Sequence, residues 1–247
     1  MADRDASVVV DALSREFGAI TALEGVDLTI DAPTILGLAG PNGSGKTTLL
    51  RCLLGLLAPS TGSVQVFGQA ATDLDADARR AIGYMPQADA VYTDLTVREN
   101  VAFFARLYGV PDRSAAVEGA LDVVGLGHRA GDRVATLSGG MVRRTSLACA
   151  VVHDPTVLVL DEPTVGLDPA LREEMWERFR TWRSEGAIIV LSTHYLGEVG
   201  HCDRIVFLRD GQVLADDTPA AVRTATGTDD LEAAFLALLA DEGERRR

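Results

Sequence analysis

The chain has 247 residues, 47% of them hydrophobic, and a formal net charge of −13. This length and apolar content predict a folded protein with one α/β core or two small lobes, and they exclude a wholly disordered chain. The acidic balance argues against sequence-independent binding of nucleic acid, which depends on basic patches.

The sequence has no apolar run of the roughly 18–20 residues that a membrane-spanning helix requires. Residues 1–7 are acidic and lack the basic and then apolar pattern of a signal peptide. Cys52, Cys149 and Cys202 form no C-x-x-C pair, so we expect buried, reduced thiols. These features predict a cytoplasmic protein that reaches a membrane only through a partner.

Basic residues are biased toward arginine, because Lys46 is the only lysine in the chain. A salt-rich cytoplasm or a GC-rich genome could each produce this bias. A chain that uses arginine elsewhere and keeps one lysine suggests that position 46 requires an ammonium group.

The predicted elements begin with strands and short helices. Strands are expected where β-branched or apolar residues alternate or run together, at 8–10, 26–30, 34–39, 63–67 and 82–85. Helices are expected between them, at 46–57, where Pro59 and Gly62 would end the helix, and at 73–81.

The strand signal disappears between about residues 95 and 150. Thr96 and Glu99 form a capping-box pattern, and an apolar stripe follows at helical spacing. Further helices are expected at 114–124 and 139–152. Strands resume at 157–160, 188–191 and 205–208, with a helix at 170–184, a short amphipathic helix at 231–239 and fraying at 244–247. This alternation predicts a mostly parallel sheet that carries an α-helical subdomain.

A phosphate-binding motif, which we call the cradle, lies between a predicted strand and a predicted helix. The segment matches G-x-x-x-x-G-K-[ST] and consists of Gly40, Pro41, Asn42, Gly43, Ser44, Gly45, Lys46, Thr47 and Thr48. Glycines let the backbone turn its N–H groups toward one anion, and the following helix adds the positive end of its dipole. Lys46 would reach the β- and γ-phosphates and Thr47 would offer a hydroxyl to Mg²⁺. A purely structural tight turn is the alternative.

Two carboxylates, Asp161 and Glu162, end the apolar strand predicted at 157–160. Ligand chemistry in open α/β sheets lies beyond the carboxyl ends of the strands. Asp161 would orient Mg²⁺ through water, and Glu162 would polarise the attacking water as general base. Either carboxylate could instead cap the loop that leads to Asp168.

Together these segments resemble the nucleotide-binding domain of the ATP-binding cassette (ABC) family. The resemblance covers about residues 8–219 and rests on ordered motifs: an aromatic residue, the cradle, a glutamine, Leu137-Ser-Gly-Gly-Met141, the acidic strand end and a histidine. It implies an α/β P-loop NTPase fold with a RecA-like, mostly parallel sheet, an N-terminal antiparallel β part and a helical subdomain at about 95–150. Residues 1–247 would form one nucleotide-binding domain with a helical tail at about 228–247.

The resemblance implies roles for the remaining motif residues. Phe17 matches the aromatic residue that stacks on adenine, although it could instead be a core residue. Gln87 matches the glutamine that touches Mg²⁺ or the lytic water, although it could be a solvated turn residue. His194 matches the γ-phosphate switch residue, although it could be a structural histidine after a strand. Asp168 matches the loop that meets its counterpart across a dimer.

The resemblance also implies a site shared between two subunits. Ser138, Gly139 and Gly140 open a helix, where a serine cap and bare N–H groups suit an anion; an ordinary helix cap is the alternative. In the family this element binds the γ-phosphate of ATP held by the other subunit. Met141 departs from the commoner glutamine, which removes a side-chain polar contact but leaves the backbone and serine contacts.

The implied protein is an ATP-hydrolysing transporter subunit that binds ATP and Mg²⁺. Two copies would close head to tail around two nucleotides and drive a separate membrane permease at the inner face of the membrane. The tail and His194-Tyr-Leu-Gly-Glu198 resemble exporters, and residues 88–95 are the expected permease-docking segment. A soluble ABC ATPase of translation or DNA repair and a non-hydrolysing regulator remain alternatives.

Overall fold

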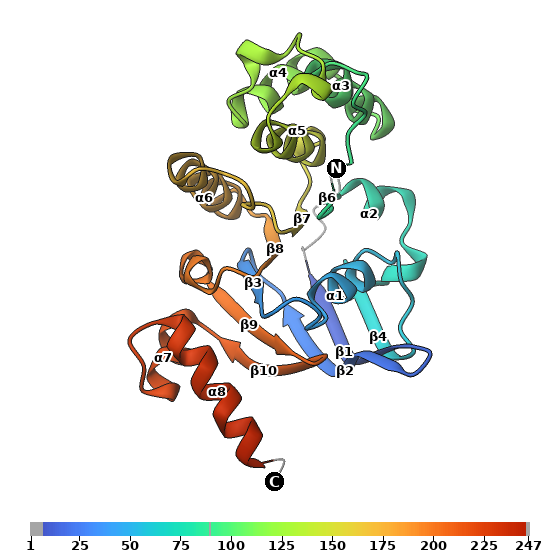
Figure 1. The fold of residues 1–247 in the computed structure, drawn as a ribbon. Helices are drawn as coiled ribbons and strands as arrows, with labels where there is room; N and C mark the ends of the chain where they lie inside the picture. The colour runs from blue at the N-terminus through green and yellow to red at the C-terminus, as the bar shows by residue number, and fades with distance from the viewer. Residues whose placement is uncertain (1–6, 89, 246–247) are drawn as a thin grey trace. The chain divides into compact units, whose positions relative to one another are not determined.

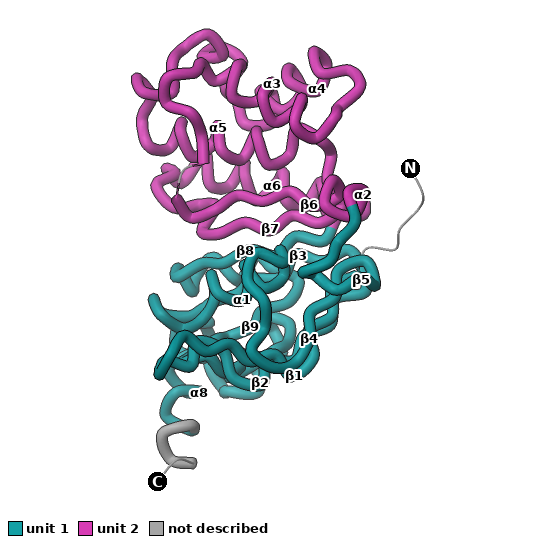
Figure 2. Tube along the Cα trace, turned by 90° about the vertical axis from the view of Figure 1, so that its right-hand side faces the viewer, with its two compact units in different colours: residues 1–75, 188–247 teal, residues 76–187 magenta. Residues whose placement is uncertain are grey.

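A computed structural model describes residues 7–88 and 90–245. The chain divides into two compact units, Met1–Asp75 with Ile188–Arg247 and Ala76–Ala187 (Figure 2). Predictions for residues 1–6, for Asp89 within the docking segment and for residues 246–247 lie outside the described residues. The α/β fold expected from the sequence is confirmed.

The first unit contains an antiparallel sheet with the strand order β2-β1-β4-β5 (Figure 1). Its strands are Val8–Phe17, Ile20–Ile30, Thr61–Val66 and Gln69–Ala70, numbered β1, β2, β4 and β5. The strands expected at 8–10 and 26–30 are parts of longer strands, because a tight turn with Gly18 at φ 61° joins β1 directly to β2. Alternate residues of both strands are buried, which fits a sheet with one covered face.

The same unit contains a group of strands around β3 (Ile35–Ala39). This strand pairs in parallel with β8 (Ile188–Thr193) on one side and β9 (Arg204–Arg209) on the other. Every residue of β3 and β8 is buried, as expected for parallel strands covered on both faces. Helix α1 (Lys46–Leu53) follows β3, so the cradle lies at the carboxyl end of this strand.

Three helix predictions in this unit and at its border are corrected. The helix expected at 46–57 ends at Leu53, because the backbone turns at Gly55 with φ 65° and packs against Ala71 so closely that a Cβ would clash. The segment 73–81 is a 3₁₀ turn, Ala71–Asp73, followed by the short α2, Ala76–Arg80. The tail helix α8 runs over Leu231–Arg245 rather than ending at 239, and residues 244 and 245 are helical rather than frayed.

Among the strands and α-helices, the short β5, β10 and α7 were not predicted. The strand β10 (Gln212–Asp217) pairs antiparallel with β9 across a turn at Asp210 and Gly211, both with positive φ. Helix α7 (Pro219–Thr226) follows it, with Thr218 as N-cap and Gly227 as left-handed C-cap.

The second unit pairs β6 (Ile82–Met85) in parallel with β7 (Val157–Asp161). Its helical part contains α3 (Val97–Leu107), α4 (Arg113–Val123) and α5 (Gly139–Val151), which pack on one another, and helix α6 (Pro169–Ser184) follows β7. The expected capping box is present, since Thr96 accepts from the Glu99 N–H and Glu99 accepts from the Thr96 N–H. The helical segment predicted at about 95–150 is therefore confirmed as a set of packed helices.

Among the described residues, no helix combines the length and the apolar content that a membrane crossing needs. The three cysteines are free and buried, as expected. Burial raises the pKa of the Cys52 thiol to about 11 and that of the Cys149 thiol to about 12, so both stay protonated.

Candidate functional site

The cradle in the first unit depends on glycine at the positions that the motif fixes. Gly40, Gly43 and Gly45 have φ angles of 153°, 82° and 106°, which L side chains rarely adopt. A Cβ at Gly40 would lie 2.2 Å from the Leu208 carbonyl oxygen, and one at Gly45 would lie 2.7 Å from that of Ala22. The loop therefore packs closely against neighbouring strands while its outer residues, Pro41 to Gly43, stay exposed.

Lys46 and Ser44 give the cradle its polar side chains. Lys46 is buried, and its Nζ donates to the carbonyl oxygens of Gly40 at 2.7 Å and Pro41 at 3.0 Å. The Ser44 hydroxyl is buried without a hydrogen-bond partner in the structure, which is costly unless a ligand or water pairs with it. A buried ammonium and an unpaired hydroxyl, together with a helix N-terminus, fit a phosphate group.

Strand register in the first unit places His194 beside the start of the cradle. Ala39, the last residue of β3, pairs with Thr193, the last residue of β8. Their successors, Gly40 and His194, therefore leave the same edge of the sheet on adjacent strands. A histidine that can hydrogen-bond to phosphate thus lies next to the phosphate-binding loop.

Phe17 lies at the end of β1 in the same unit, with 45% of its surface exposed. The Arg15 guanidinium lies 4.6 Å from the centroid of its ring. This exposure excludes the alternative that Phe17 is a core residue, and it leaves a ring face suited to stacking on a planar base.

The acidic strand end lies in the second unit. Asp161 is the last residue of β7, and Asp161 and Glu162 are both buried. Glu162 has φ 54°, a left-handed conformation that is strained for a residue with a Cβ and that often marks functional sites. Gln87 Nε2 donates to Glu162 Oε2 at 3.3 Å, so the predicted glutamine and the predicted base are in contact.

Two helix starts lie in the same unit. Ser138 is the N-cap of α5 and accepts from the Met141 N–H at 3.4 Å, and Asp168 is the N-cap of α6 and accepts from the Leu171 N–H at 3.0 Å. Ser138 and Gly139 are exposed, so the start of α5 is open to a ligand. The helix cap expected of Ser138 is thus present, the cap formed by Asp168 was not predicted, and the exposed start of α5 leaves backbone N–H groups available for an anion.

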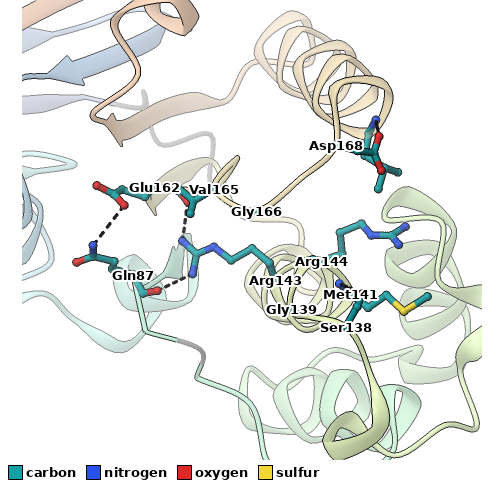
Figure 3. A pocket seen from close by; sticks show the side chains of 12 residues that line it. Gln87, Ser138, Gly139, Met141, Arg143, Arg144, Glu162, Val165, Gly166 and Asp168 are labelled. Carbon is teal, nitrogen blue, oxygen red and sulfur yellow. Dashed lines mark hydrogen bonds between the residues drawn. The ribbon is translucent and has the colours of Figure 1, made fainter.

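One pocket of about 720 Å³ collects these residues within the second unit (Figure 3). Its walls are formed by the loop after β6, the start of α5 and the segment from β7 to α6, and they include Gln87, Ser138, Gly139, Gly140, Glu162 and Asp168. The structure thus brings together these sequence-predicted residues of the second unit, whereas Asp161 does not line the pocket. The structure adds Arg143 and Arg144, which were not predicted from the sequence although they lie only three and four residues after Gly140.

The donors available for a metal ion are few and are all oxygens. Among the described residues, no group of three or more His, Cys, Asp or Glu side chains comes together. Asp161, Thr47 and Gln87 offer a carboxylate, a hydroxyl and an amide oxygen. Each of these oxygen donors is of a kind that hard cations prefer.

Comparison with known proteins agrees with the arrangement of motifs. Residues 23–165 match the family model described as ABC transporter. A curated relative, Nod factor export ATP-binding protein I of Burkholderia lata, is 40% identical over 224 residues, which cover 89% of this chain and 74% of that protein.

Solved structures show the same similarity. An ATP-binding subunit of an ABC transporter superposes with a TM-score of 0.86 at 30% identity, covering 94% of this chain and 99% of that one. A dimeric ATP-binding cassette in a post-hydrolysis state with ADP and Pi gives a TM-score of 0.78 at 27% identity, covering 85% and 98%. The chain therefore belongs to the ABC transporter family, as one of its ATP-binding and ATP-hydrolysing subunits.

Proposed function

We propose that this chain hydrolyses Mg·ATP to drive export through a separate membrane permease. Gly40 to Thr48 hold the phosphates, with Lys46 as the cation, and Phe17 stacks on the base. Thr47, Asp161 and Gln87 would be the ligands for Mg²⁺, which when bound would neutralise charge on the phosphates. Glu162 takes the proton of the attacking water, and His194 contacts the γ-phosphate.

The contact between Gln87 and Glu162 is the observation that carries this proposal. A general base needs a carboxylate fixed in one orientation, and the Gln87 amide donates to Glu162 Oε2 at 3.3 Å. Glu162 keeps a strained backbone at the end of a fully buried strand. Strain of this kind persists only where the surrounding structure imposes it, which supports a catalytic role for this carboxylate.

The exposed start of α5 supports a site completed by a second copy of the chain. Ser138 and Gly139 are open to solvent, and Gly139 has space where a Cβ would lie. In a head-to-tail dimer this helix N-terminus binds the γ-phosphate held by the cradle of the other copy. Asp168 lies in the same pocket wall and meets its counterpart across the dimer.

The direction of transport is proposed from similarity to a relative, and the permease contact is proposed from an exposed segment. The curated relative is named for the export of Nod factor, so export is the direction that we propose. Within 88–95, Tyr92 is 52% exposed and stacks edge to face on Phe103 at 5.1 Å, which forms an aromatic surface for a permease loop. The chain would then lie at the cytoplasmic face of the membrane, held there by the permease.

Steady-state ATPase measurements test this function. The chain with its permease should release phosphate from ATP when Mg²⁺ is present, and removal of Mg²⁺ with EDTA should stop the release. Glu162→Gln should still bind ATP, with turnover lowered about 10²- to 10⁴-fold. Binding of ATP without hydrolysis, even with the permease, would instead indicate a regulator, and co-purification with ribosomes rather than membranes would indicate a soluble ABC ATPase.

A further inference from the structure

Arg143 is a buried cation in the second unit, with 6% of its surface exposed. Its Nη1 donates to the carbonyl oxygens of Pro86 at 2.8 Å and Gln87 at 2.9 Å. Its Nη2 donates to the carbonyl oxygen of Glu162 at 2.8 Å and also to that of Asp161. One side chain from α5 thus holds the backbone of the two segments that carry the proposed glutamine and base (Figure 3).

We propose that Arg143 is a positioning residue for ATP hydrolysis, which sets the orientation of Glu162 relative to Gln87. This inference rests on the proposed function of Glu162 as general base. Its four hydrogen bonds described above go to main-chain carbonyl oxygens, so the role that we assign to Arg143 is to hold the backbone and not to transfer a proton.

The contacts require a guanidinium group. Arginine presents five N–H donors in a rigid planar fork, whereas lysine offers three donors from a single nitrogen. Four carbonyl acceptors on two separate segments match the two ends of the fork. A lysine at this position keeps the charge and the stem but cannot bridge both pairs of carbonyls.

The bridge also explains how the strained residue is kept in place. Glu162 at φ 54° would relax toward ordinary φ values unless neighbouring groups hold its backbone. Arg143 supplies such a hold at the Glu162 carbonyl, and it lies four residues after Gly139, the first residue of α5. A displacement of the start of α5 would therefore be passed to Glu162 through one turn of this helix and the Arg143 side chain.

Arg143→Lys in the full chain with its permease tests the proposal. A shift of about 1 Å in a catalytic group costs roughly 100-fold in rate, so kcat should fall about 10- to 100-fold. KM for ATP should stay within about twofold of wild type, because the cradle belongs to the other unit. In the Glu162→Gln background the same substitution should have no further effect on residual turnover, since the residue that it positions has lost its function.

Arg204→Lys is the matched control. Arg204 donates to the Thr29 carbonyl oxygen and to both carboxylate oxygens of Asp216, at the opposite end of β9 from the cradle. Arg204→Lys should lower Tm about as much as Arg143→Lys does, while leaving kcat unchanged. Wild-type kcat in Arg143→Lys, or an equal loss of kcat in both variants, would overturn the positioning role. An inactive wild-type protein would instead overturn the proposed function itself.

Discussion

The two units differ in how their candidate sites are built. In the first unit the phosphate cradle is one continuous segment, and its shape comes from the backbone of Gly40, Gly43 and Gly45. In the second unit the pocket that we propose for hydrolysis is formed by segments far apart in the sequence, and side-chain contacts such as Gln87 to Glu162 join them. In the function that we propose, phosphate binding by the cradle is therefore encoded locally and hydrolysis depends on tertiary structure, so substitutions should separate the two.

Glu162→Gln should produce the largest effect and the cleanest separation. General acid–base catalysis contributes about 10²- to 10⁴-fold, so kcat should fall by that factor while the Kd for ATP stays within about twofold. Phosphate release and nucleotide titration measure the two quantities. Glu174→Gln, at an exposed position on α6, is the control and should behave as wild type. A variant that keeps its turnover would remove Glu162 from the mechanism.

Lys46→Arg should show the opposite separation. The compact ammonium is buried against the Gly40 and Pro41 carbonyls, and a planar guanidinium does not fit the same space. Loss of a charged hydrogen bond costs about 1.5–3 kcal/mol, so ATP affinity should fall roughly 10- to 100-fold. Unchanged affinity would mean that position 46 only requires a positive charge.

Gly139→Ala should sharpen the distinction between a structural cap and a ligand site. Gly139 has an ordinary φ and open space around a Cβ, so alanine should raise the free energy of unfolding by about 0.4–1 kcal/mol. The added methyl group should nevertheless lower turnover about tenfold, because it obstructs the partner's phosphate. Gly119→Ala in α4, also in open space, should stabilise equally with wild-type turnover. Normal activity in Gly139→Ala would indicate an ordinary helix cap.

The smallest effect concerns His153, which stacks on Tyr108 at 3.7 Å and donates from Nε2 to the Ile82 carbonyl. Burial lowers its pKa below the ordinary value of 6.5. The unfolded chain therefore binds more protons, and the free energy of unfolding should fall as pH decreases below about 6.5 and level off below the folded-state pKa. His153→Gln should remove this part of the pH dependence in denaturant titrations, whereas exposed His128→Gln should not.

The contrast between the units also explains what the sequence could reveal. The cradle could be predicted because its glycines and the single lysine are adjacent in the sequence. Strands β3, β7 and β8 could be predicted because fully buried strands consist of continuous apolar residues. The role of Arg143 could not be predicted, because its partners are main-chain carbonyl oxygens and every residue type has one. Helix α7 was missed although Thr218, Pro219 and Gly227 form a readable pattern of cap, first-turn proline and terminal glycine.

The most direct test of the whole account is the mass of Glu162→Gln in solution at saturating Mg·ATP, measured by light scattering. If each nucleotide is bound by the cradle of one copy and the Ser138 helix of the other, the 26.2 kDa chain should form a dimer that separates when ATP is removed. Adding Gly139→Ala to this variant should weaken the dimer. A particle that stays monomeric at saturating nucleotide, with and without the permease, would contradict the shared site.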